Sequence, residues 1–224
     1  MKIGGFIKLS LLNYPNKAAC TVFTSGCNFR CPFCYNSEIV NETESLDPDV
    51  VFQYLLKRKG ILDGVCVTGG EPLIHRDAIP FLQNIKQLGY SVKLDTNGSY
   101  PDTLQEIISK NAVDYVAMDI KNTFEKYSET SGKPDIDPYL IQQSINILKT
   151  SGISYEFRTT VVREYHTQTD IETIAKTLQG SAVWYLQRFM NTETVFQCGL
   201  HSPSEKDMKI YRSIGNRYVK TMVR

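Results

Sequence analysis

The chain has 224 residues, of which 42% are hydrophobic, so it can bury the core of one domain of ordinary size. Its 25 basic and 24 acidic residues nearly cancel and no basic run stands out, which argues against binding to nucleic acid or to a membrane surface. The N-terminal residues lack the pattern of a signal peptide, and no segment is apolar for long enough to span a bilayer. We therefore expect a cytoplasmic protein with a single domain over residues 1–224.

Along the chain, short apolar runs typical of strands alternate with longer runs of helical period. The predicted strands cover residues 19–24, 64–68, 91–95, 113–119, 154–162 and 183–189. The predicted helices cover residues 47–59, 76–88, 101–110, 137–150, 169–179 and 204–214. Residues 121–136 are polar and rich in turn formers, so we expect a loop there at the functional mouth. The repeated strand–helix order predicts an α/β fold with parallel strands and right-handed crossovers.

The faces of the predicted strands distinguish an open doubly wound sheet from a barrel. Asp119 and Lys121 share one face at the end of the fourth strand, and Arg158 and Gln187 project from the strands that follow. A closed eight-stranded barrel fills its interior with apolar side chains. Charged residues that repeatedly face inward favour instead a partial (β/α)6 TIM-like barrel around a polar cavity.

Six cysteines occur, and three of them, Cys27, Cys31 and Cys34, fall within one short segment directly after the first predicted strand. Neighbouring glycine, asparagine and proline residues indicate a loop rather than a buried core. Three thiolates this close together can converge on one metal centre. We expect the other three to be core or lumen thiols rather than ligands: Cys20, Cys66 and Cys198.

Three kinds of metal or redox site come into question for this segment. Structural zinc normally takes four ligands, often as two pairs, and no second pair exists here. A thiol–disulfide switch would use the C-x-x-C element from Cys31 to Cys34 but would leave Cys27 without a role. An iron–sulfur cluster with three protein thiolates fits better, because it leaves one iron open for a substrate or cofactor.

Polar groups also follow the next strands. The second predicted strand ends in Gly69, Gly70 and Glu71, where bare backbone can meet a ligand and the carboxylate can accept a hydrogen bond from an ammonium group. The third strand ends with Asp95 and Asn97 on one face. The carboxyl ends of the strands are where α/β barrels hold their active sites, so these residues are candidates for one site.

Together, the C-x3-C-x2-C spacing, the aromatic residue before the last cysteine and the later GGE motif resemble the radical S-adenosylmethionine (SAM) superfamily. The resemblance implies a [4Fe-4S] cluster on Cys27, Cys31 and Cys34 whose open iron binds the amino and carboxylate groups of SAM. It also implies one-electron cleavage of SAM to give a 5′-deoxyadenosyl radical.

A finer resemblance extends over roughly residues 5–190. It rests on the segments TSGCNFRCPFCYN, VTGGEPL, KLDTNGS, DYVAMDIKN and YEFRTTVV. These segments are similar to those of glycyl-radical-enzyme activases, above all to barrel-only proteins that activate anaerobic ribonucleoside-triphosphate reductase. The resemblance implies cofactor-binding roles for Phe33, Gly69, Gly70, Glu71, Asp95, Asn97, Asp119, Lys121 and Arg158, the last three also as catalytic residues.

The resemblance implies an anaerobic ribonucleotide reductase as the protein substrate and a flavodoxin or ferredoxin-type electron donor. Two positions depart from the related proteins: Tyr35 replaces the usual histidine after the third cysteine, and Arg188 interrupts the usual LQQF of the sixth strand. We expect both residues to lie on the side of the site that binds the substrate, so they bear on which substrate is used. A radical SAM enzyme acting on a small molecule, as in deazapurine synthesis, therefore remains an alternative, and a zinc or thiol binding module is a third.

Overall fold

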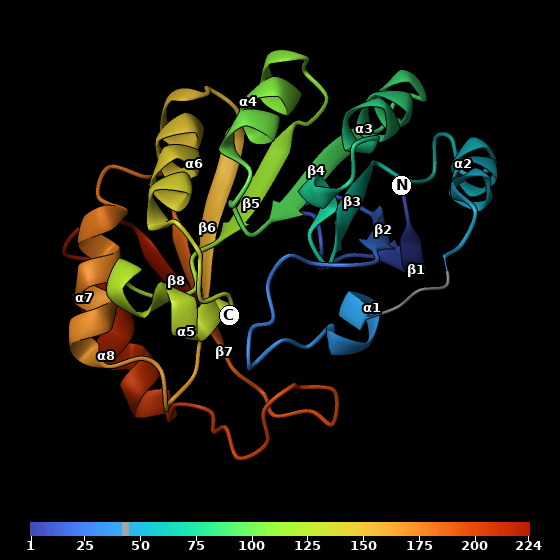
Figure 1. Cartoon of the computed structure of the whole chain (residues 1–224). Helices are drawn as coiled ribbons and strands as arrows, with labels where there is room; N and C mark the ends of the chain where they lie inside the picture. Colours follow the sequence, from blue (N-terminus) through green and yellow to red (C-terminus); the bar gives the residue numbers. More distant parts are fainter. Residues whose placement is uncertain (42–44) are drawn as a thin grey trace.

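The computed structural model describes residues 1–41 and 45–224 and contains one curved sheet of eight strands (Figure 1). The strands lie in the sheet in chain order, and each is hydrogen-bonded to the next. β1 runs antiparallel to β2, and all later neighbours are parallel. Their bounds are β1 Ile3–Ser10, β2 Ala19–Thr24, β3 Gly64–Gly69, β4 Ser91–Thr96, β5 Tyr115–Asp119, β6 Ser154–Val161, β7 Trp184–Arg188 and β8 Thr221–Val223.

Helices connect the parallel strands. The main ones are α2 Pro48–Leu56, α3 Ala78–Gln87, α4 Pro101–Ser109, α6 Pro138–Thr150, α7 Gln168–Thr177 and α8 Glu205–Gly215. Figure 1 shows α3, α4, α6 and α7 following one another around the outside of the sheet. No helix in the described ranges is both long and apolar enough to cross a bilayer. The six predicted strands and six predicted helices, and with them the partial barrel, are confirmed.

The helices begin where local chemistry predicts. Thr167 and Ser204 start α7 and α8 as N-caps, and each forms a reciprocal capping box with the residue three positions later. α2 and α6 each begin with a proline after an aspartate, Asp47 or Asp137, whose carboxylate accepts a backbone N–H of the first turn. These caps fix where each connection leaves the rim of the sheet.

Short elements were missing from the prediction. β1 and β8 extend the sheet at its two edges, and α1 (Ser37–Asn41) follows the cysteine-rich segment. The stretch 121–136, which we expected to be a loop, instead contains the 3-10 helix η2 (Phe124–Lys126) and α5 (Tyr127–Ser131). Another 3-10 helix, η1 (Pro72–Ile74), follows β3. Within the described residues β8 does not pair with β1, so the barrel is not closed by hydrogen bonds.

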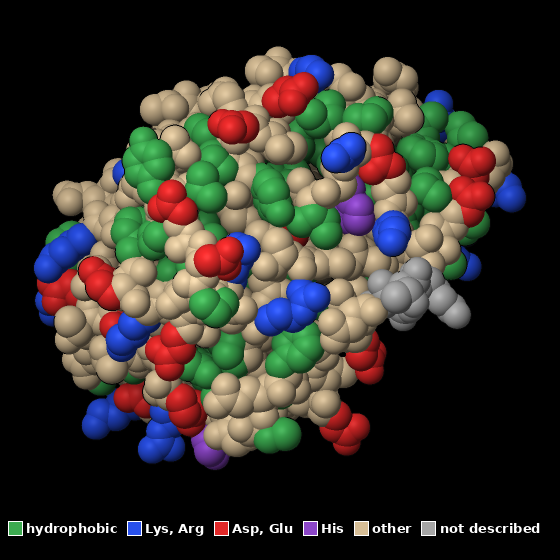
Figure 2. All heavy atoms as spheres, viewed as in Figure 1, with side chains coloured by type: hydrophobic (Ala, Val, Ile, Leu, Met, Phe, Trp, Pro, Cys, Tyr) green, Lys and Arg blue, Asp and Glu red, His purple; other side chains and the backbone are tan. Residues whose placement is uncertain are grey.

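The parallel strands end at one edge of the sheet. Thr24 pairs with Gly69 at the ends of β2 and β3, and Asp119 pairs with Arg158 on β5 and β6. The segments that follow these strands therefore meet at a common rim. On the face of the molecule seen in Figure 2, acidic and basic side chains are mixed rather than gathered in a patch of one sign.

Candidate active site

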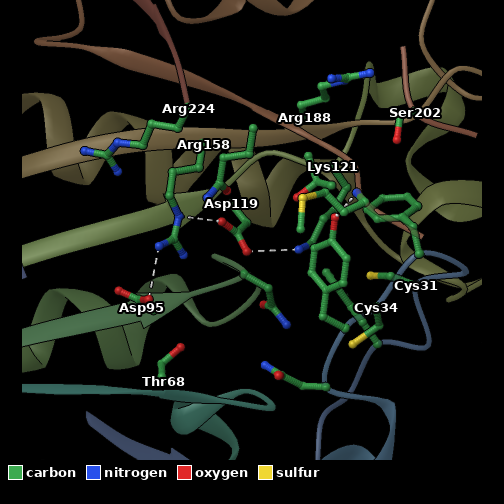
Figure 3. Close-up of a pocket in the computed structure, with 18 of the residues that line it drawn as sticks. Cys31, Cys34, Thr68, Asp95, Asp119, Lys121, Arg158, Arg188, Ser202 and Arg224 are labelled. Atoms are coloured by element: carbon green, nitrogen blue, oxygen red, sulfur yellow. Dashed lines mark hydrogen bonds and ion pairs between the residues drawn. The ribbon is translucent and has the colours of Figure 1, made fainter. Parts of the chain in front are cut away.

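Residues 25–36, here called the cysteine loop, leave the end of β2 and border a cavity of about 1170 Å³. Cys27, Cys31 and Cys34 all line this cavity, and none of them forms a disulfide. Cys31 is buried, whereas Cys27 and Cys34 are half-buried. Figure 3 shows Cys31 and Cys34 across the cavity from the charged residues of the sheet. The structure thus brings the three predicted cluster ligands to one wall.

Gly69 and Gly70 allow the cysteine loop to lie close to the end of β3. A Cβ atom on Gly70 would come within 1.8 Å of the carbonyl oxygen of Gly26, and Glu71 N donates to that same oxygen at 2.9 Å. Gly69 has a φ of +112°, which residues with a side chain rarely adopt. Both glycines line the cavity, as the sequence predicted. The structure adds that Gly70 is also required by the close approach of the cysteine loop.

The other side of the cysteine loop rests on α5. Arg30 N donates to Ser131 O at 2.8 Å, and Gly132, which ends α5 with a φ of +61°, lies under the Arg30 carbonyl. A Cβ on Gly132 would come within 2.1 Å of that carbonyl oxygen. The segment that we expected to be a loop at the functional mouth therefore supports the cysteine loop through α5.

The three thiols fit an iron–sulfur cluster better than a single ion. In residues 1–41 and 45–224, no group of three or more His, Cys, Asp or Glu side chains is arranged to hold one metal ion. A four-iron cluster binds each thiolate through a different iron, so its ligands stand further apart. Burial raises the pKa of Cys27 to about 12 and that of Cys31 to about 11. Binding of the cluster would therefore displace protons from these thiols.

Opposite the cysteines, charged side chains of alternating sign form a row across three neighbouring strands (Figure 3). Arg158 Nη1 lies 3.0 Å from Asp95 Oδ2, and Arg158 Nε lies 2.9 Å from Asp119 Oδ1. Lys121 Nζ lies 3.1 Å from Asp119 Oδ2, and Lys93 pairs with Asp95 at the other end. This row, called the charge row below, confirms that β4, β5 and β6 turn polar residues inward.

The charges in the row stabilise one another. Burial alone would disfavour the charged forms of Asp119 and Lys121, but their partners outweigh it. Arg158 and Lys121 lower the pKa of Asp119 to about 2, and Asp119 together with Cys31 raises the pKa of Lys121. Among the described residues Lys121 Nζ donates to Asp119 only, so its ammonium keeps spare donors beside the cysteines. A carboxylate entering the cavity can accept them.

Glu71 does not take the place we expected for it. Its side chain is fully buried and is not part of the cavity lining. One carboxylate oxygen accepts Leu73 N at 3.0 Å and Thr96 Oγ1 at 2.8 Å, and the other accepts Asn97 N at 2.6 Å. Burial raises its pKa to about 7 although these donors oppose the shift. The expectation that Glu71 presents its carboxylate to the cavity is corrected: it ties the end of β4 to the turn after β3.

Asn97 and Phe33 line the cavity as predicted, but their polar or aromatic groups already have partners. Asn97 Nδ2 donates to Asn28 Oδ1 at 2.9 Å, which joins the end of β4 to the cysteine loop. The Phe33 ring packs against Tyr165 with centroids 5.9 Å apart. Both side chains therefore hold the cavity wall in shape, and the backbone of Phe33 stays next to the cysteines.

The segment of residues 189–202, here called the strap, lies against the cysteine loop and was not predicted to do so. The Tyr35 ring stacks on Phe189 with centroids 5.8 Å apart, and Tyr35 Oη accepts Met190 N at 2.7 Å. Gln197 N donates to Pro32 O at 3.0 Å. The tyrosine that departs from the related proteins is therefore one of the residues that join the cysteine loop to the strap. In the sequence, the one signal for Tyr35 was that it replaces the histidine usual in the related proteins.

Sequence reasoning did not identify several other residues that line the cavity. They are Thr68, Thr160, Ser202, Lys209, Arg212 and Arg224. Arg224 pairs with the buried Glu156 at 3.0 Å and lies over the Tyr185 ring. In the sequence, the amphipathic period of α8 was the one signal that could have placed Lys209 and Arg212 on the same face of a helix. Cys20 and Cys66 are buried, as expected for core thiols, but Cys198 is exposed and does not line the cavity, so the expectation of a core or lumen thiol is corrected for Cys198.

Comparisons of the sequence with known proteins show its family and several relatives. The family model of the radical SAM superfamily matches residues 21–178. A protein of Methanocaldococcus jannaschii, provisionally named a glycyl-radical enzyme activating enzyme, is 31% identical over 99% of this chain and 94% of its own length. A 7-carboxy-7-deazaguanine synthase of Halobacterium salinarum is 42% identical, but over 35% of this chain and 31% of its own length.

Solved structures show the same fold at low sequence identity. A domain of a pyruvate-formate lyase-activating enzyme from Bacteroides vulgatus is 20% identical, has a TM-score of 0.60, and the match covers 72% of this chain and 98% of that domain. Streptococcus suis SuiB bound to its precursor peptide SuiA is 14% identical with a TM-score of 0.69, covering 91% of this chain and 48% of that protein. The partial barrel is therefore the fold of the radical SAM enzymes.

Proposed function

The chain belongs to the radical SAM superfamily, and from this premise we propose that it is an activase that generates a glycyl radical on a partner enzyme. The observation that carries the proposal is the similarity to the M. jannaschii protein along nearly the whole of both chains. The match covers 99% of this chain, so the segments that line the cavity lie almost entirely within the matched region. The chain is in any case an enzyme of the radical SAM class.

Superfamily membership implies a [4Fe-4S] cluster and SAM. We assign the cluster to Cys27, Cys31 and Cys34, which share one wall of the cavity. When bound, the cluster would supply the electron for the cleavage of SAM to methionine and a 5′-deoxyadenosyl radical, which would abstract a hydrogen atom from the glycine Cα.

The residues facing the cysteines have the chemistry to hold SAM. Gly69 and Gly70 expose backbone at the cysteine wall, and Lys121 offers spare donors for a carboxylate. Asp119 and Arg158 fix the direction of the Lys121 ammonium and form a polar floor suited to hydroxyl groups. In this proposal Lys121, Asp119 and Arg158 act by binding and orienting SAM, with no proton transfer assigned to them.

The proposed partner is an anaerobic ribonucleotide reductase, with a flavodoxin or ferredoxin-type protein as the electron donor. We place this chemistry in the cytoplasm and in one radical SAM domain over residues 1–224. The cavity of about 1170 Å³ would have to hold the cluster and SAM as well as the substrate, which enters from the rim of the sheet.

A second candidate is a radical SAM reaction on a small molecule. The match to the H. salinarum 7-carboxy-7-deazaguanine synthase supports it, since identity there reaches 42%. That match spans about a third of either protein, however, whereas the similarity to the activating enzyme extends over the full chain.

Anaerobic incubation with a reductant, SAM and a candidate anaerobic ribonucleotide reductase tests the proposal. A glycyl radical doublet in the electron paramagnetic resonance spectrum of the reductase is the expected result. If 5′-deoxyadenosine forms without a radical on any glycyl radical enzyme, while a small molecule is converted to 7-carboxy-7-deazaguanine, the second candidate replaces the first.

A further inference from the structure

One face of α8 forms a wall of the cavity. Glu205, Met208, Lys209 and Arg212 all line it, and their spacing of three and four residues places them on one side of the helix. Arg188, at the end of β7, lines the cavity as well. These five residues are called the α8 wall below. The opposite side of α8 packs against the body of the protein, mainly through α7 and β8.

Within residues 1–41 and 45–224, the cations of the α8 wall have no ionic partner. Arg188, Lys209 and Arg212 are exposed, and none of them forms a salt bridge with another residue in the described part of the chain. Glu205 stands four residues before Lys209 on the same face, yet the two do not pair. The wall therefore carries three cations against one carboxylate.

The deeper charges of the cavity are already compensated. Asp95 and Asp119 are shared among the cations of the charge row, and Arg224 is paired with Glu156. The uncompensated charge of the cavity is thus positive and lies on the α8 wall. An unsatisfied set of cations beside a cavity attracts and orients an anionic ligand.

We propose that the α8 wall binds carboxylate side chains next to the target glycine in the protein segment that enters the cavity. The inference rests on the proposed function, because it names the chemistry of that substrate segment. A segment of a protein suits the wall better than a compact anion does. The cations are spread over two turns of a helix and the end of a strand, and they are exposed rather than gathered in a buried pocket.

Arg188 is less suitable for a test, since its Nε already donates to Pro203 O at 2.9 Å. Within the described part of the chain, the side chains of Lys209 and Arg212 form no such hydrogen bond. Lys206 provides a matched control, because it is an exposed lysine on the same helix that does not line the cavity. Replacing both cavity cations gives Lys209→Glu/Arg212→Glu, and the control is Lys206→Glu.

The experiment measures anaerobic binding of a fluorescent peptide with a central glycine flanked by glutamates, to the full chain loaded with its cluster and SAM. A peptide with glutamines in place of the glutamates is the neutral probe. We expect the acidic peptide to bind about 5-fold or more tightly than the neutral one, and less tightly as NaCl rises from about 0.05 to about 0.3 M. The double variant should weaken acidic-peptide binding by about 10-fold or more, and Lys206→Glu by less than about 2-fold.

Equal binding of the two peptides, or equal losses in the double variant and in the control, would overturn the proposal. Inorganic pyrophosphate that displaces the peptide at concentrations well below the peptide's own dissociation constant would also overturn it, in favour of a phosphorylated small molecule. Failure of the activase function itself gives a different result: binding keeps its dependence on charge, but no glycyl radical forms on any partner.

Discussion

Asp119 and Arg158 face each other as register partners on β5 and β6, with Arg158 Nε 2.9 Å from Asp119 Oδ1. Because the guanidinium also reaches Asp95 on β4, one side chain joins three strands at the floor of the cavity. A lysine could not do this, since its single ammonium lacks the fork of the guanidinium. Because Asp95, Asp119 and Arg158 all lie on strands, the sheet rather than a loop fixes the position of these side chains.

Loss of the central cation should therefore destabilise the protein. We expect Arg158→Leu to lower the free energy of unfolding by about 3 kcal/mol, because it leaves two inward carboxylates with one cation each. Arg158→Lys should cost less, about 1 kcal/mol, since the charge is kept and one bridge can form. Anaerobic urea unfolding measures both. An Arg158→Leu protein as stable as the parent would show that the row contributes nothing to folding.

The cluster assignment predicts a clear difference among cysteine variants. Cys27→Ala, Cys31→Ala and Cys34→Ala should each lose bound iron and SAM cleavage, since three thiolates are the complete protein ligand set. Cys198→Ser should keep both, because Cys198 is exposed and does not line the cavity. Anaerobic iron and sulfide analysis decides the matter: four irons in the Cys31→Ala protein would rule out the assignment.

Lys121 should contribute to SAM affinity without holding the cluster. A charge-assisted hydrogen bond is worth about 1.5–3 kcal/mol, so Lys121→Met should weaken SAM binding by about 10- to 150-fold and retain iron. Lys59→Met, which changes an exposed lysine outside the cavity, is the control. Equilibrium dialysis with labelled SAM measures the dissociation constants. An unchanged value for Lys121→Met would exclude contact between this ammonium and SAM.

Glu71 should make stability depend on pH. Its pKa is raised by burial to about 7, so between its ordinary pKa and 7 the folded protein keeps a proton that the unfolded chain releases. Stability from this residue is thus greatest below pH 4.5 and falls by up to about 3 kcal/mol as the pH rises to 7. Glu71→Gln cannot ionise and should lack this decline.

The difference in unfolding free energy between the parent and Glu71→Gln isolates that residue from His75 and His166. The pKa of each histidine is lowered by burial, which makes stability rise with pH and works against the slope from Glu71. Parallel pH profiles for the two proteins would contradict the prediction. Glu71→Ala should be the least stable variant, because it leaves Thr96 Oγ1 and the N–H groups of Leu73 and Asn97 without their acceptor.

The Tyr35 contact should hold the strap in place. Tyr35→Phe removes the acceptor for Met190 N but keeps the stack on Phe189, whereas Tyr35→Ala removes both. We expect limited thermolysin cleavage near the exposed Phe196 to accelerate slightly in Tyr35→Phe and markedly in Tyr35→Ala. Cleavage at the parent rate in Tyr35→Ala would mean that other contacts suffice to fix the strap.

The strand and helix pattern could be predicted because each element carries its own signal. Runs such as residues 19–24 are apolar and end at turn formers, and α8 begins at a capping serine, Ser204. β1 gave no such signal: Gly4 and Gly5 interrupt it, its register shifts twice, and it lies at an edge with much of its surface exposed. β8 has three residues, too few for a period to show.

The site residues could be predicted as a set but not in their individual roles. Motif spacing placed the cysteines and the charge row correctly at one rim, because parallel strands end together. Spacing says nothing about which way a carboxylate turns after its strand ends, and Glu71 turned toward three backbone and hydroxyl donors instead of the cavity. Motif spacing also could not reveal the contact between Tyr35 and the strap, because residues more than 150 positions apart meet only in the folded chain.

The missing pairing between β8 and β1 has a topological consequence. A loop of another protein is tethered at both ends, so it cannot be threaded through a closed ring and could enter one only as a doubled hairpin. In the described residues the two edge strands are not hydrogen-bonded to each other, so a tethered segment would not have to pass through a closed ring of strands. An interrupted barrel is thus compatible with repeated, reversible visits to a substrate that never leaves its parent chain.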